Sequence, residues 1–451
     1  MLSAAPAAAG SGLAALRARE FGRLDEQGQA YLDYGGSALY GESQLRAHHE
    51  ILRGGLFGNP HSDSLPARAS TAVIEAARRR LLDFLDVDAS THAVIFTANA
   101  SAAVKLVAES YPFAPDVGCL LSADNHNSVN GVREYARRAG ARVRYLPLDT
   151  RLRLLDPEAA LAEEAARGGG GLFAFPAQSN FSGVLHPLAL VESAHALGLD
   201  VLLDVAAYVP SRALSLRACA ADFAVLSFYK LFGYPTGLGA LVARQEALAR
   251  LRRPWFAGGT VAAASVATGT HRLRAGGEGF EDGTPSFLAV SALDAGFDLL
   301  AEAGMERLGA HVARLTRTFL DGLGALRHAG GQPLVTVYGP PGPLGRGGIV
   351  AFNVCDAGGR PRPFAEVEAR AREAKVAVRG GCFCNPGAAE AALGLDGARL
   401  ASCYTSLGDA ISAERLAACL NAPVGAVRAS FGLANNDADV RRALEVIATF
   451  R

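Results

Sequence analysis

The stretch from Ser227 to Leu241 reads SFYKLFGYPTGLGAL, and it places Lys230 at the end of an apolar run, just before a turn rich in glycine and proline. Lysine and arginine together number 44, yet only Lys105, Lys230 and Lys375 are lysines. Arginine keeps its proton at working pH, whereas a desolvated lysine can lose its proton and form an imine. Lys230 is therefore a candidate catalytic amine. A lysine stem that lies over apolar surface with its ammonium in water explains this stretch alone equally well.

A carboxylate ends another apolar run upstream of Lys230. Val201–Leu203 reads as a buried strand, and Asp204 follows it directly. Burying a carboxylate is costly unless it meets a cation, and ligands of doubly wound sheets bind at the carboxyl ends of strands. A lysine and an aspartate from neighbouring strand ends are what pyridoxal phosphate (PLP) requires, one for its aldehyde and one for its pyridine nitrogen. Asp204 could instead merely cap the following helix.

Apolar runs alternate with amphipathic stretches from about Tyr31 to Arg244. The alternation predicts an α/β fold, in which a mostly parallel seven-stranded sheet lies between helices. The predicted strands are Ala93–Phe96, Gly118–Leu121, Val143–Leu146, Gly171–Phe175, Val201–Leu203, Phe223–Ser227 and Gly239–Ala243. The clearest helical patterns between them are Ala102–Ser110, Val129–Ala139 and Leu188–Leu197.

The pattern changes after about Pro285. Two long helices are predicted at Phe287–Leu300 and Met305–Leu326, and a last helix should have Asn435 or Asn436 as its N-cap. Strands of a smaller α+β region are predicted at Leu334–Tyr338, Gly348–Val354, Lys375–Val378 and Ala426–Ser430. We therefore expect three parts: an N-terminal tail or arm (1–30), a large domain (31–285), and connecting helices with a small α+β C-terminal domain (286–451).

Charge and hydropathy argue against two classes of partner. The 44 basic and 44 acidic side chains give a formal net charge of zero, so nucleic-acid binding has no electrostatic support. No apolar run approaches the ~20 residues of a membrane span. Met1–Leu16 has no basic residue ahead of its apolar part, so we expect a frayed tail rather than a secretory signal. The seven cysteines are an odd number with irregular spacing, which favours reduced thiols in a cytoplasmic protein.

Three loops complete the candidate site. Residues 96–101 (FTANAS) run from a strand into a helix, and such a turn can present backbone N–H groups to a phosphate, although an ordinary strand–helix turn looks the same. His126 follows another strand and could stack on a flat ring or simply be solvated. Residues 380–387 (GGCFCNPG) carry Cys382 and Cys384 among glycines. A Cys-x-Cys pair without a second pair is a poor metal site, so we expect no metal.

Together these segments resemble the class V aminotransferase family of fold-type I PLP enzymes, and in particular its cysteine desulfurase branch. Within that branch the chain is similar to the amino-terminal desulfurase domain of the molybdenum cofactor sulfurases. The motifs that carry the resemblance are Tyr31–Asp33 (YLD), Gly58–Ser62 (GNPHS), Asp124–Ala136 (DNHNSVNGVREYA), Ser227–Leu241, Phe280–Thr284 (FEDGT), Arg379–Gly387 and Val427–Phe431 (VRASF). They extend over residues 31–431, nearly the whole chain.

The resemblance implies a role for each matching residue. Lys230 matches the lysine that holds PLP as a Schiff base, Asp204 the partner of the pyridine nitrogen, and His126 the residue stacked on the ring. Arg428 matches the residue that pairs with the substrate carboxylate. Cys384 matches the cysteine that accepts sulfur, which leaves Cys382 a structural or auxiliary role.

Further positions follow from the same resemblance. The phosphate would be held by Ala100, Ser101 and Ser227, with Tyr229 as an additional cofactor-binding position. Thr284 resembles a residue that reaches the phosphate of the neighbouring subunit's cofactor, which implies a homodimer. Asn59 and His61, in the GNPHS motif, are implied as substrate-binding residues.

Three positions depart from the wider desulfurase pattern. Ala207 stands where many relatives have a glutamine that touches the cofactor's phenolic oxygen, and Tyr229 stands where many have a histidine. These departures put the tuning of the ring and the phosphate contact in doubt. Gly380 replaces a frequent threonine, which would loosen the cysteine loop.

The function implied by the resemblance is PLP-dependent removal of sulfur from L-cysteine, giving alanine and a persulfide on Cys384 for transfer to an acceptor such as a protein. A different class V reaction, such as a lyase, epimerase or aminotransferase reaction, would need the same Lys230 and make Cys384 incidental. A non-catalytic scaffold for sulfur transfer is the third hypothesis, and the presence of Lys230, Asp204, His126 and Arg428 argues against it.

Overall fold

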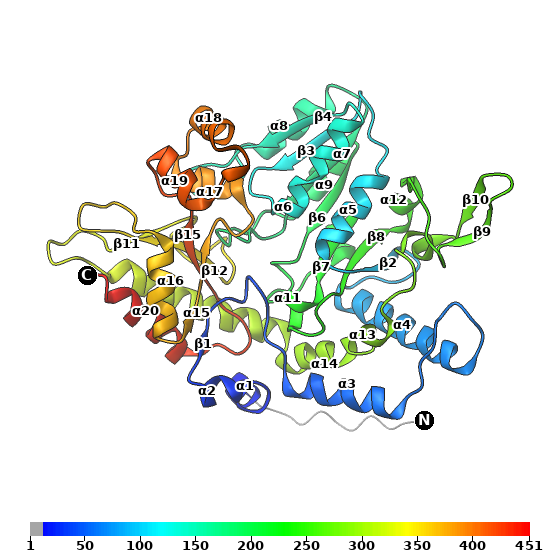
Figure 1. Cartoon of the computed structure of the whole chain (residues 1–451), viewed down its shortest axis with the longest axis horizontal. Helices are drawn as coiled ribbons and strands as arrows, with labels where there is room; N and C mark the ends of the chain where they lie inside the picture. The colour runs from blue at the N-terminus through cyan, green and yellow to red at the C-terminus, as the bar shows by residue number, and fades with distance from the viewer. Residues whose placement is uncertain (1–11) are drawn as a thin grey trace.

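The structure is a computed structural model and describes residues 12–451 (Figure 1). Its largest sheet has seven strands in the order β2-β8-β7-β6-β5-β3-β4. These strands are β2 (His92–Thr97), β3 (Gly118–Ser122), β4 (Arg142–Leu146), β5 (Gly171–Pro176), β6 (Leu199–Asp204), β7 (Phe223–Ser227) and β8 (Gly239–Arg244). Strands β7, β6, β5, β3 and β4 are parallel, and β8 runs antiparallel between β7 and β2. The predicted mostly parallel seven-stranded sheet is confirmed.

Helices cover both faces of this sheet, because successive side chains of each buried strand point to opposite sides. On β6, Val201 and Leu203 join one hydrophobic cluster and Leu202 joins the other. Helices α4 and α9 pack on the first face, and α5 and α7 on the second. The helices of this part are α3 (Glu42–Gly54), α4 (Leu65–Phe84), α5 (Ala100–Ser110), α6 (Asn127–Asn130), α7 (Val132–Arg138), α8 (Pro157–Ala165), α9 (Leu190–Ala196), α10 (Leu216–Cys219), α11 (Phe228–Phe232) and α12 (Gln245–Arg250).

A smaller antiparallel sheet, in the order β11-β12-β15-β14, lies beyond the long helix α15. Its strands are β11 (Val335–Val337), β12 (Ile349–Val354), β14 (Arg379–Gly381) and β15 (Ala426–Ser430), and the helices of this region are α13 (Phe287–Val290), α14 (Leu293–Ala303), α15 (Met305–Ala325), α16 (Phe364–Glu373), α17 (Pro386–Leu393), α18 (Gly397–Leu407), α19 (Ala413–Leu420) and α20 (Asp437–Ala448). Asn436 caps α20 by accepting the N–H of Asp439, as one of the two predicted caps. The division into domains at 31 and 286 stays a prediction.

The start of the described chain packs against its end. Helices α1 (Leu13–Phe21) and α2 (Arg23–Glu26) precede β1 (Ala30–Tyr31), which pairs in parallel with β13 (Val376–Ala377). The buried Arg17 guanidinium of α1 lies 2.6 Å from the carboxylate of Asp439 in α20. The prediction of a frayed tail over Met1–Leu16 is therefore wrong for Leu13–Leu16, which are helical and held by this packing; residues 1–11 lie outside the described part.

The hairpin of β9 (Val261–Ser265) and β10 (Thr270–Leu273) stands out from the body of the molecule (Figure 1). β9 is largely exposed and rich in alanine, and β10 alternates exposed with half-buried residues, so neither strand carries the pattern of a buried strand. The short 3-10 helix Gly276–Phe280 follows them. No helix of the described residues is long and apolar enough to cross a membrane.

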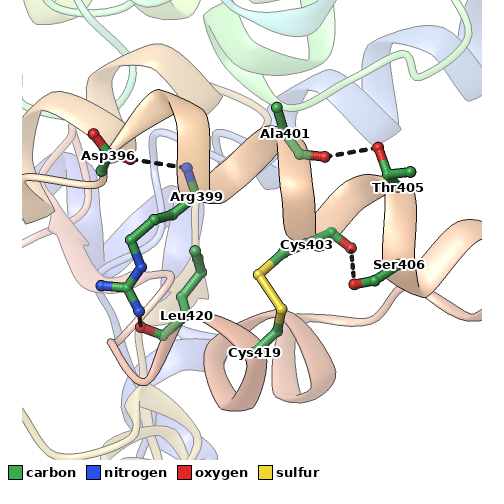
Figure 2. Close-up of a disulfide and its surroundings, with 8 residues drawn as sticks. All are labelled: Asp396, Arg399, Ala401, Cys403, Thr405, Ser406, Cys419 and Leu420. Atoms are coloured by element: carbon green, nitrogen blue, oxygen red, sulfur yellow. Dashed lines mark hydrogen bonds between the residues drawn. A yellow bond between two sulfur atoms is a disulfide. The ribbon is translucent and has the colours of Figure 1, made fainter.

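A disulfide joins Cys403 of α18 to Cys419 of α19 (Figure 2). The two helices form a hairpin that brings the Cα atoms to 6.0 Å, although 16 residues separate the cysteines in sequence. The expectation that all seven cysteines are reduced is thus wrong, because the pairing depends on how two helices fold back rather than on a recognisable spacing. The argument from cysteines for a cytoplasmic protein is weakened accordingly.

Reducing this disulfide is expected to loosen the α18–α19 hairpin. Its own hydrophobic cluster has only Leu400, Cys403 and Leu420 as buried members, and closing a loop of this length contributes about 3 kcal/mol. Hydrogen exchange over residues 395–424 should therefore rise in dithiothreitol, and Cys403→Ser should raise it without reductant. Cys219→Ser, which removes a buried free thiol elsewhere, is the control. Equal protection in the oxidised and reduced protein would contradict this role.

Candidate functional site

Three predicted side chains meet at the carboxyl edge of the large sheet. Lys230 lies in α11 directly after β7, Asp204 is the last residue of β6, and His126 follows β3 as the N-cap of α6. Burial lowers the pKa of Lys230, and the nearby carboxylate of Asp204 opposes this shift. Among residues 12–451, no hydrogen bond or ion pair holds the Lys230 ammonium. The structure therefore presents a desolvated amine that can become neutral at a lower pH than an exposed lysine.

The His126 ring is held in one orientation. Its Nδ1 accepts the backbone N–H of Ser128 at 3.1 Å, which places the proton of the neutral ring on Nε2. Burial lowers the pKa of His126, the positive charge of Lys230 adds to this shift, and Asp204 opposes it. A neutral, fixed imidazole is suited to lie against a flat ring.

Asp204 has a hydrogen-bond partner in its own turn as well as its electrostatic interactions with Lys230 and His126. Its Oδ1 accepts the N–H of Ala206 at 2.9 Å and so caps a turn. The alternative that Asp204 caps a helix is wrong, because the next helix, α10, begins only at Leu216. The same carboxylate opposes the lowering of the pKa of both Lys230 and His126, because its negative charge lies near both. Capping therefore fixes the orientation of a carboxylate that belongs to the site.

The predicted phosphate turn lies beside α11. The Ser227 hydroxyl accepts the N–H of Ala100 at 2.8 Å, and Asn99 caps α5 by accepting the N–H of Ala102 at 3.0 Å. The Ser101 hydroxyl is bonded to the hydroxyl of Ser128 from the neighbouring loop. Hydroxyls and the N-terminus of the eleven-residue helix α5 thus converge, which is the arrangement that binds a phosphate group.

Arg428, on β15, is 2% exposed and approaches the site from the smaller sheet. Its Nη2 donates to Asp33 Oδ1 at 2.9 Å and its Nη1 to the carbonyl of Asn180 at 2.9 Å. Its Nε is buried and has no hydrogen-bond partner among the described residues. A Cβ on Gly35 would lie 3.1 Å from Arg428 Cζ, so a glycine here leaves space beside the guanidinium. An unpaired N–H with adjacent space fits a group that binds a carboxylate.

Asp33 and Arg379 are site residues to which sequence reasoning gave no role. Arg379 donates to Asp33 Oδ2 from both Nε, at 2.9 Å, and Nη2, at 2.7 Å, so one carboxylate bridges two arginines. Both residues lie within the quoted motifs YLD and Arg379–Gly387. The sequence carried no sign of their pairing, because it joins positions 346 residues apart.

Cys384 is the exposed thiol of the loop, and Cys382 is half-buried. Burial raises the pKa of the Tyr229 phenol, and a negative charge on Cys384 adds to this shift. A negative charge on Cys384 also opposes the lowering of the Lys230 pKa by burial. Cys382 packs instead against the hydrophobic cluster around Phe181. The carbonyl of Cys384 accepts the N–H of Asn127, the residue after His126, at 2.7 Å, so the turn of Cys384 is bonded to a loop of the Lys230 site.

The three departures from the family pattern lie close to this site. Ala207 and Lys230 line one small cavity on the inner side of α11. Gly380 lies in β14, where its N–H donates to Glu368 at 2.6 Å. A Cβ on Gly380 would lie 2.3 Å from the Phe364 ring, so close packing rather than loosening accompanies this glycine.

Asn59, His61 and Thr284 are not brought to Lys230 within this chain. His61 lines a separate cavity of about 360 Å³ together with Arg78 and Glu281, and Asn59 and Thr284 are exposed. No hydrogen bond or ion pair among residues 12–451 joins any of the three to the Lys230 site. The described residues also hold no group of three or more His, Cys, Asp or Glu side chains suited to a metal ion.

The sequence matches the family model for class V aminotransferases over residues 30–443. It is 35% identical over 463 residues to the molybdenum cofactor sulfurase of Homo sapiens, covering 97% of this chain and 51% of the human protein. It is 36% identical over 449 residues to that of Solanum lycopersicum, covering 92% of this chain and 54% of the tomato protein. The chain therefore spans about half the length of the curated relatives that it matches.

Solved structures share the fold. The apo cysteine desulfurase of Thermococcus onnurineus NA1 superposes with a TM-score of 0.79 at 23% identity, covering 96% of each chain. A cysteine desulfurase of Escherichia coli gives a TM-score of 0.76 at 23% identity, covering 98% of each chain. These likenesses confirm the expected fold.

Proposed function

Because the chain belongs to the class V aminotransferase family, we propose that it is a PLP-dependent enzyme that transfers the sulfur of L-cysteine to Cys384. The observation that carries this proposal is that the turn of the exposed thiol Cys384 is bonded to the loop that holds His126, through the N–H of Asn127 and the Cys384 carbonyl at 2.7 Å. A class V enzyme of another reaction type needs the amine and has no use for the thiol.

The residues present fit PLP. An unpaired amine (Lys230), a carboxylate held by a hydrogen bond (Asp204) and an oriented neutral imidazole (His126) lie at the carboxyl edge of the large sheet. The hydroxyl of Ser227 with the first turn of α5 offers a cradle for the phosphate. Lys230 would hold the aldehyde and Asp204 would keep the pyridine nitrogen protonated. When bound, PLP supplies a sink for the electron pair that forms at the substrate Cα.

The chain's own groups would divide the reaction between them. Arg428 binds the substrate carboxylate with its free Nε–H and so orients the Cα–H bond. The Lys230 amine, whose pKa is lowered by burial, takes the Cα proton. The Cys384 thiolate attacks the substrate sulfur: a new S–S bond forms, the C–S bond breaks, and its electron pair stays with the carbon skeleton, which is protonated and leaves as alanine. The net change is cysteine plus thiol to alanine plus persulfide.

Incubating the PLP-loaded protein with L-cysteine tests this function. We expect alanine to appear together with a Cys384 peptide heavier by one sulfur atom, because the two products come from one step. Alanine and sulfide are measured in solution, and the peptide mass locates the sulfur. No alanine with an unmodified Cys384 would overturn the proposal.

The position of Asn59, His61 and Thr284 supports a further part of the proposal, a homodimer. These residues lie outside the Lys230 site of their own chain, in the region that would contribute to a second copy's site if two chains associate across it. Sedimentation of the purified protein measures this directly. We propose that the sulfur then passes to an acceptor, which is a protein or a small molecule. Adding candidate thiols to the persulfide assay tests this transfer.

The lowered pKa of Lys230 has a consequence that can be measured without substrate. A neutral amine reacts with acetic anhydride, so Lys230 of the folded, PLP-free protein should become reactive at a lower pH than Lys230 of the same protein in urea. Peptide masses resolve the site, because the chain has only three lysines. The unfolded protein serves as the control for the reagent. Equal pH profiles in the two states would contradict the desolvated amine.

Asp33→Asn should weaken substrate binding. Asp33 holds Arg428 and Arg379 in place, and losing a hydrogen bond to a charged group costs about 1.5–3 kcal/mol, or roughly 10- to 150-fold in affinity. The half-saturating L-cysteine concentration for the change in cofactor absorbance measures the effect. Asp437→Asn, which removes a half-exposed ion pair with Arg314, is the matched control and should change little. If the half-saturating L-cysteine concentration is unchanged in Asp33→Asn, Asp33 has no role in substrate binding.

A further inference from the structure

The turn that carries Cys384 has an unusual backbone. Phe383 and Cys384 are consecutive, neither is glycine, and both have a left-handed conformation with φ of 56° and 55°. Side chains disfavour this conformation, so two such residues in sequence persist only where the surroundings hold them. The glycines of the loop predict a thiol on a freely moving segment. The left-handed backbone indicates instead that surrounding contacts hold this turn.

Two buried asparagines hold this turn. Asn180 is 8% exposed and Asn385 is fully buried. Asn180 Nδ2 donates to the carbonyl of Phe383 at 2.7 Å, and its Oδ1 accepts from Asn385 Nδ2 at 2.9 Å. Asn385 Nδ2 also donates to the carbonyl of Asp124 at 2.6 Å. We call these four residues' contacts the asparagine clamp.

The asparagine clamp ties the turn to the large sheet. Asn180 follows β5 and Asp124 follows β3, two neighbouring parallel strands, whereas the turn itself lies between β14 and α17. On the other side of the turn, the Cys384 carbonyl accepts the N–H of Asn127 at 2.7 Å. The backbone on both sides of the thiol is therefore bonded to the edge of the sheet that also presents Lys230.

The same contacts reach the substrate-binding arginine. Arg428 Nη1 donates to the backbone carbonyl of Asn180 at 2.9 Å. Its guanidinium carbon lies 4.7 Å from the centre of the Phe383 ring, a cation–π distance. One short assembly thus connects the group proposed to bind the carboxylate with the residue next to the thiol.

We infer that Asn180 and Asn385 are positioning residues, which hold the Cys384 turn so that the thiol stands at the Lys230 site in fixed relation to Arg428. The inference rests on the proposed function. It departs from the picture of a thiol that travels on a flexible loop: the clamp places the thiol before substrate arrives, and the persulfide would be collected where it forms.

Asn→Asp substitutions separate this role from simpler ones. Asn385 also caps α17, with its Oδ1 accepting the N–H of Ala388 at 3.1 Å. Aspartate keeps that acceptor and the shape of the side chain, but it loses both donors of Nδ2. Asn385→Asp therefore breaks the clamp and spares the cap. Asn180→Asp removes the donor to Phe383 and leaves the backbone carbonyl that Arg428 uses.

The first measurement needs no activity. Hydrogen exchange over residues 382–388 of the PLP-free protein should lose protection in both variants, and alkylation of the half-buried Cys382 by iodoacetamide should speed up as the turn loosens. Asn435→Asp is the matched control: Asn435 is 3% exposed, donates to the carbonyl of Tyr31 at 2.7 Å, and lies at the start of α20, away from the turn. If the two variants behave as this control does, the clamp does not hold the turn and the inference is overturned.

The second measurement separates positioning from general damage. In single turnovers with L-cysteine, both variants should form persulfide about 10- to 100-fold more slowly, because a misplaced thiol loses its approach to sulfur. The half-saturating concentration for the cofactor absorbance change should stay within about twofold of the parent, since Arg428 remains in place. Slower persulfide formation together with a raised half-saturating concentration, or a change in neither quantity, would overturn the inference. A parent protein that forms no persulfide would refute the proposed function, while the exchange and alkylation results would still decide the clamp.

Discussion

Lys230→Ala should lower the rate of alanine formation from L-cysteine by at least about 10³-fold, since proton transfer by a positioned base alone contributes about 10²–10⁴-fold. The variant loses both the amine that would hold PLP and the base that would take the Cα proton. No neighbouring amine can replace it, because Lys105 and Lys375 are the only other lysines of the chain. The rate of alanine release measures the loss of the base. The mass of the peptide that contains position 230, after borohydride treatment of parent and variant, measures the loss of the cofactor adduct.

Lys105→Ala is the control for this prediction. Lys105 lies on α5, close in sequence to the phosphate turn, but its side chain is 62% exposed and forms only a loose ion pair with Glu109. It should keep parental activity and a cofactor adduct on Lys230. Comparable alanine formation in Lys230→Ala and Lys105→Ala would remove Lys230 from the reaction, and with it the proposed chemistry.

Cys384→Ala should abolish the persulfide and lower alanine formation from L-cysteine by at least about 10³-fold, because the nucleophile that splits the C–S bond is gone. Substrate binding should persist, since Arg428 and Lys230 are untouched. The change in cofactor absorbance on adding L-cysteine measures binding, and peptide mass spectrometry measures the persulfide. Binding without sulfur transfer is the signature expected.

Cys382→Ala tests whether the loss is specific to one thiol. Cys382 packs in the cluster around Phe181 and is half-buried, so its replacement should affect stability more than sulfur transfer. Turnover of L-cysteine that survives Cys384→Ala would instead support another class V reaction, in which the thiol is incidental. Sulfur found on Cys382 in the parent would exchange the roles of the two cysteines.

The large sheet could be predicted from the sequence because most of its strands are short runs dominated by apolar residues. All seven predicted strands are present, and Lys230, Asp204 and His126 lie together because the carboxyl ends of parallel strands share one edge. Their catalytic roles stay predictions. The hairpin of β9 and β10 was missed because its strands are exposed, and the hydrophobic pattern that marks a buried strand is absent.

The polar framework around the site could not be predicted for a different reason. Asp33, Asn180 and Asn385 act through partners that are far away in sequence, and an aspartate or asparagine in a loop carries no sign of which partner it meets. The Cys403–Cys419 disulfide could not be predicted for the same reason, since it depends on how one helix folds back along another. Local patterns specify elements, while these contacts depend on how the elements assemble.

The pairing of Asp33 with Arg428 has a consequence for biosynthesis. The two residues are 395 positions apart, so the ribosome must add 395 residues after Asp33 before the ion pair can form. A nascent chain that stops before β15 contains all seven strands of the large sheet and Lys230, but not the guanidinium proposed to receive the substrate carboxylate. The proposed ability to bind substrate therefore arises only once β15 has been synthesised and has met the segment around Asp33.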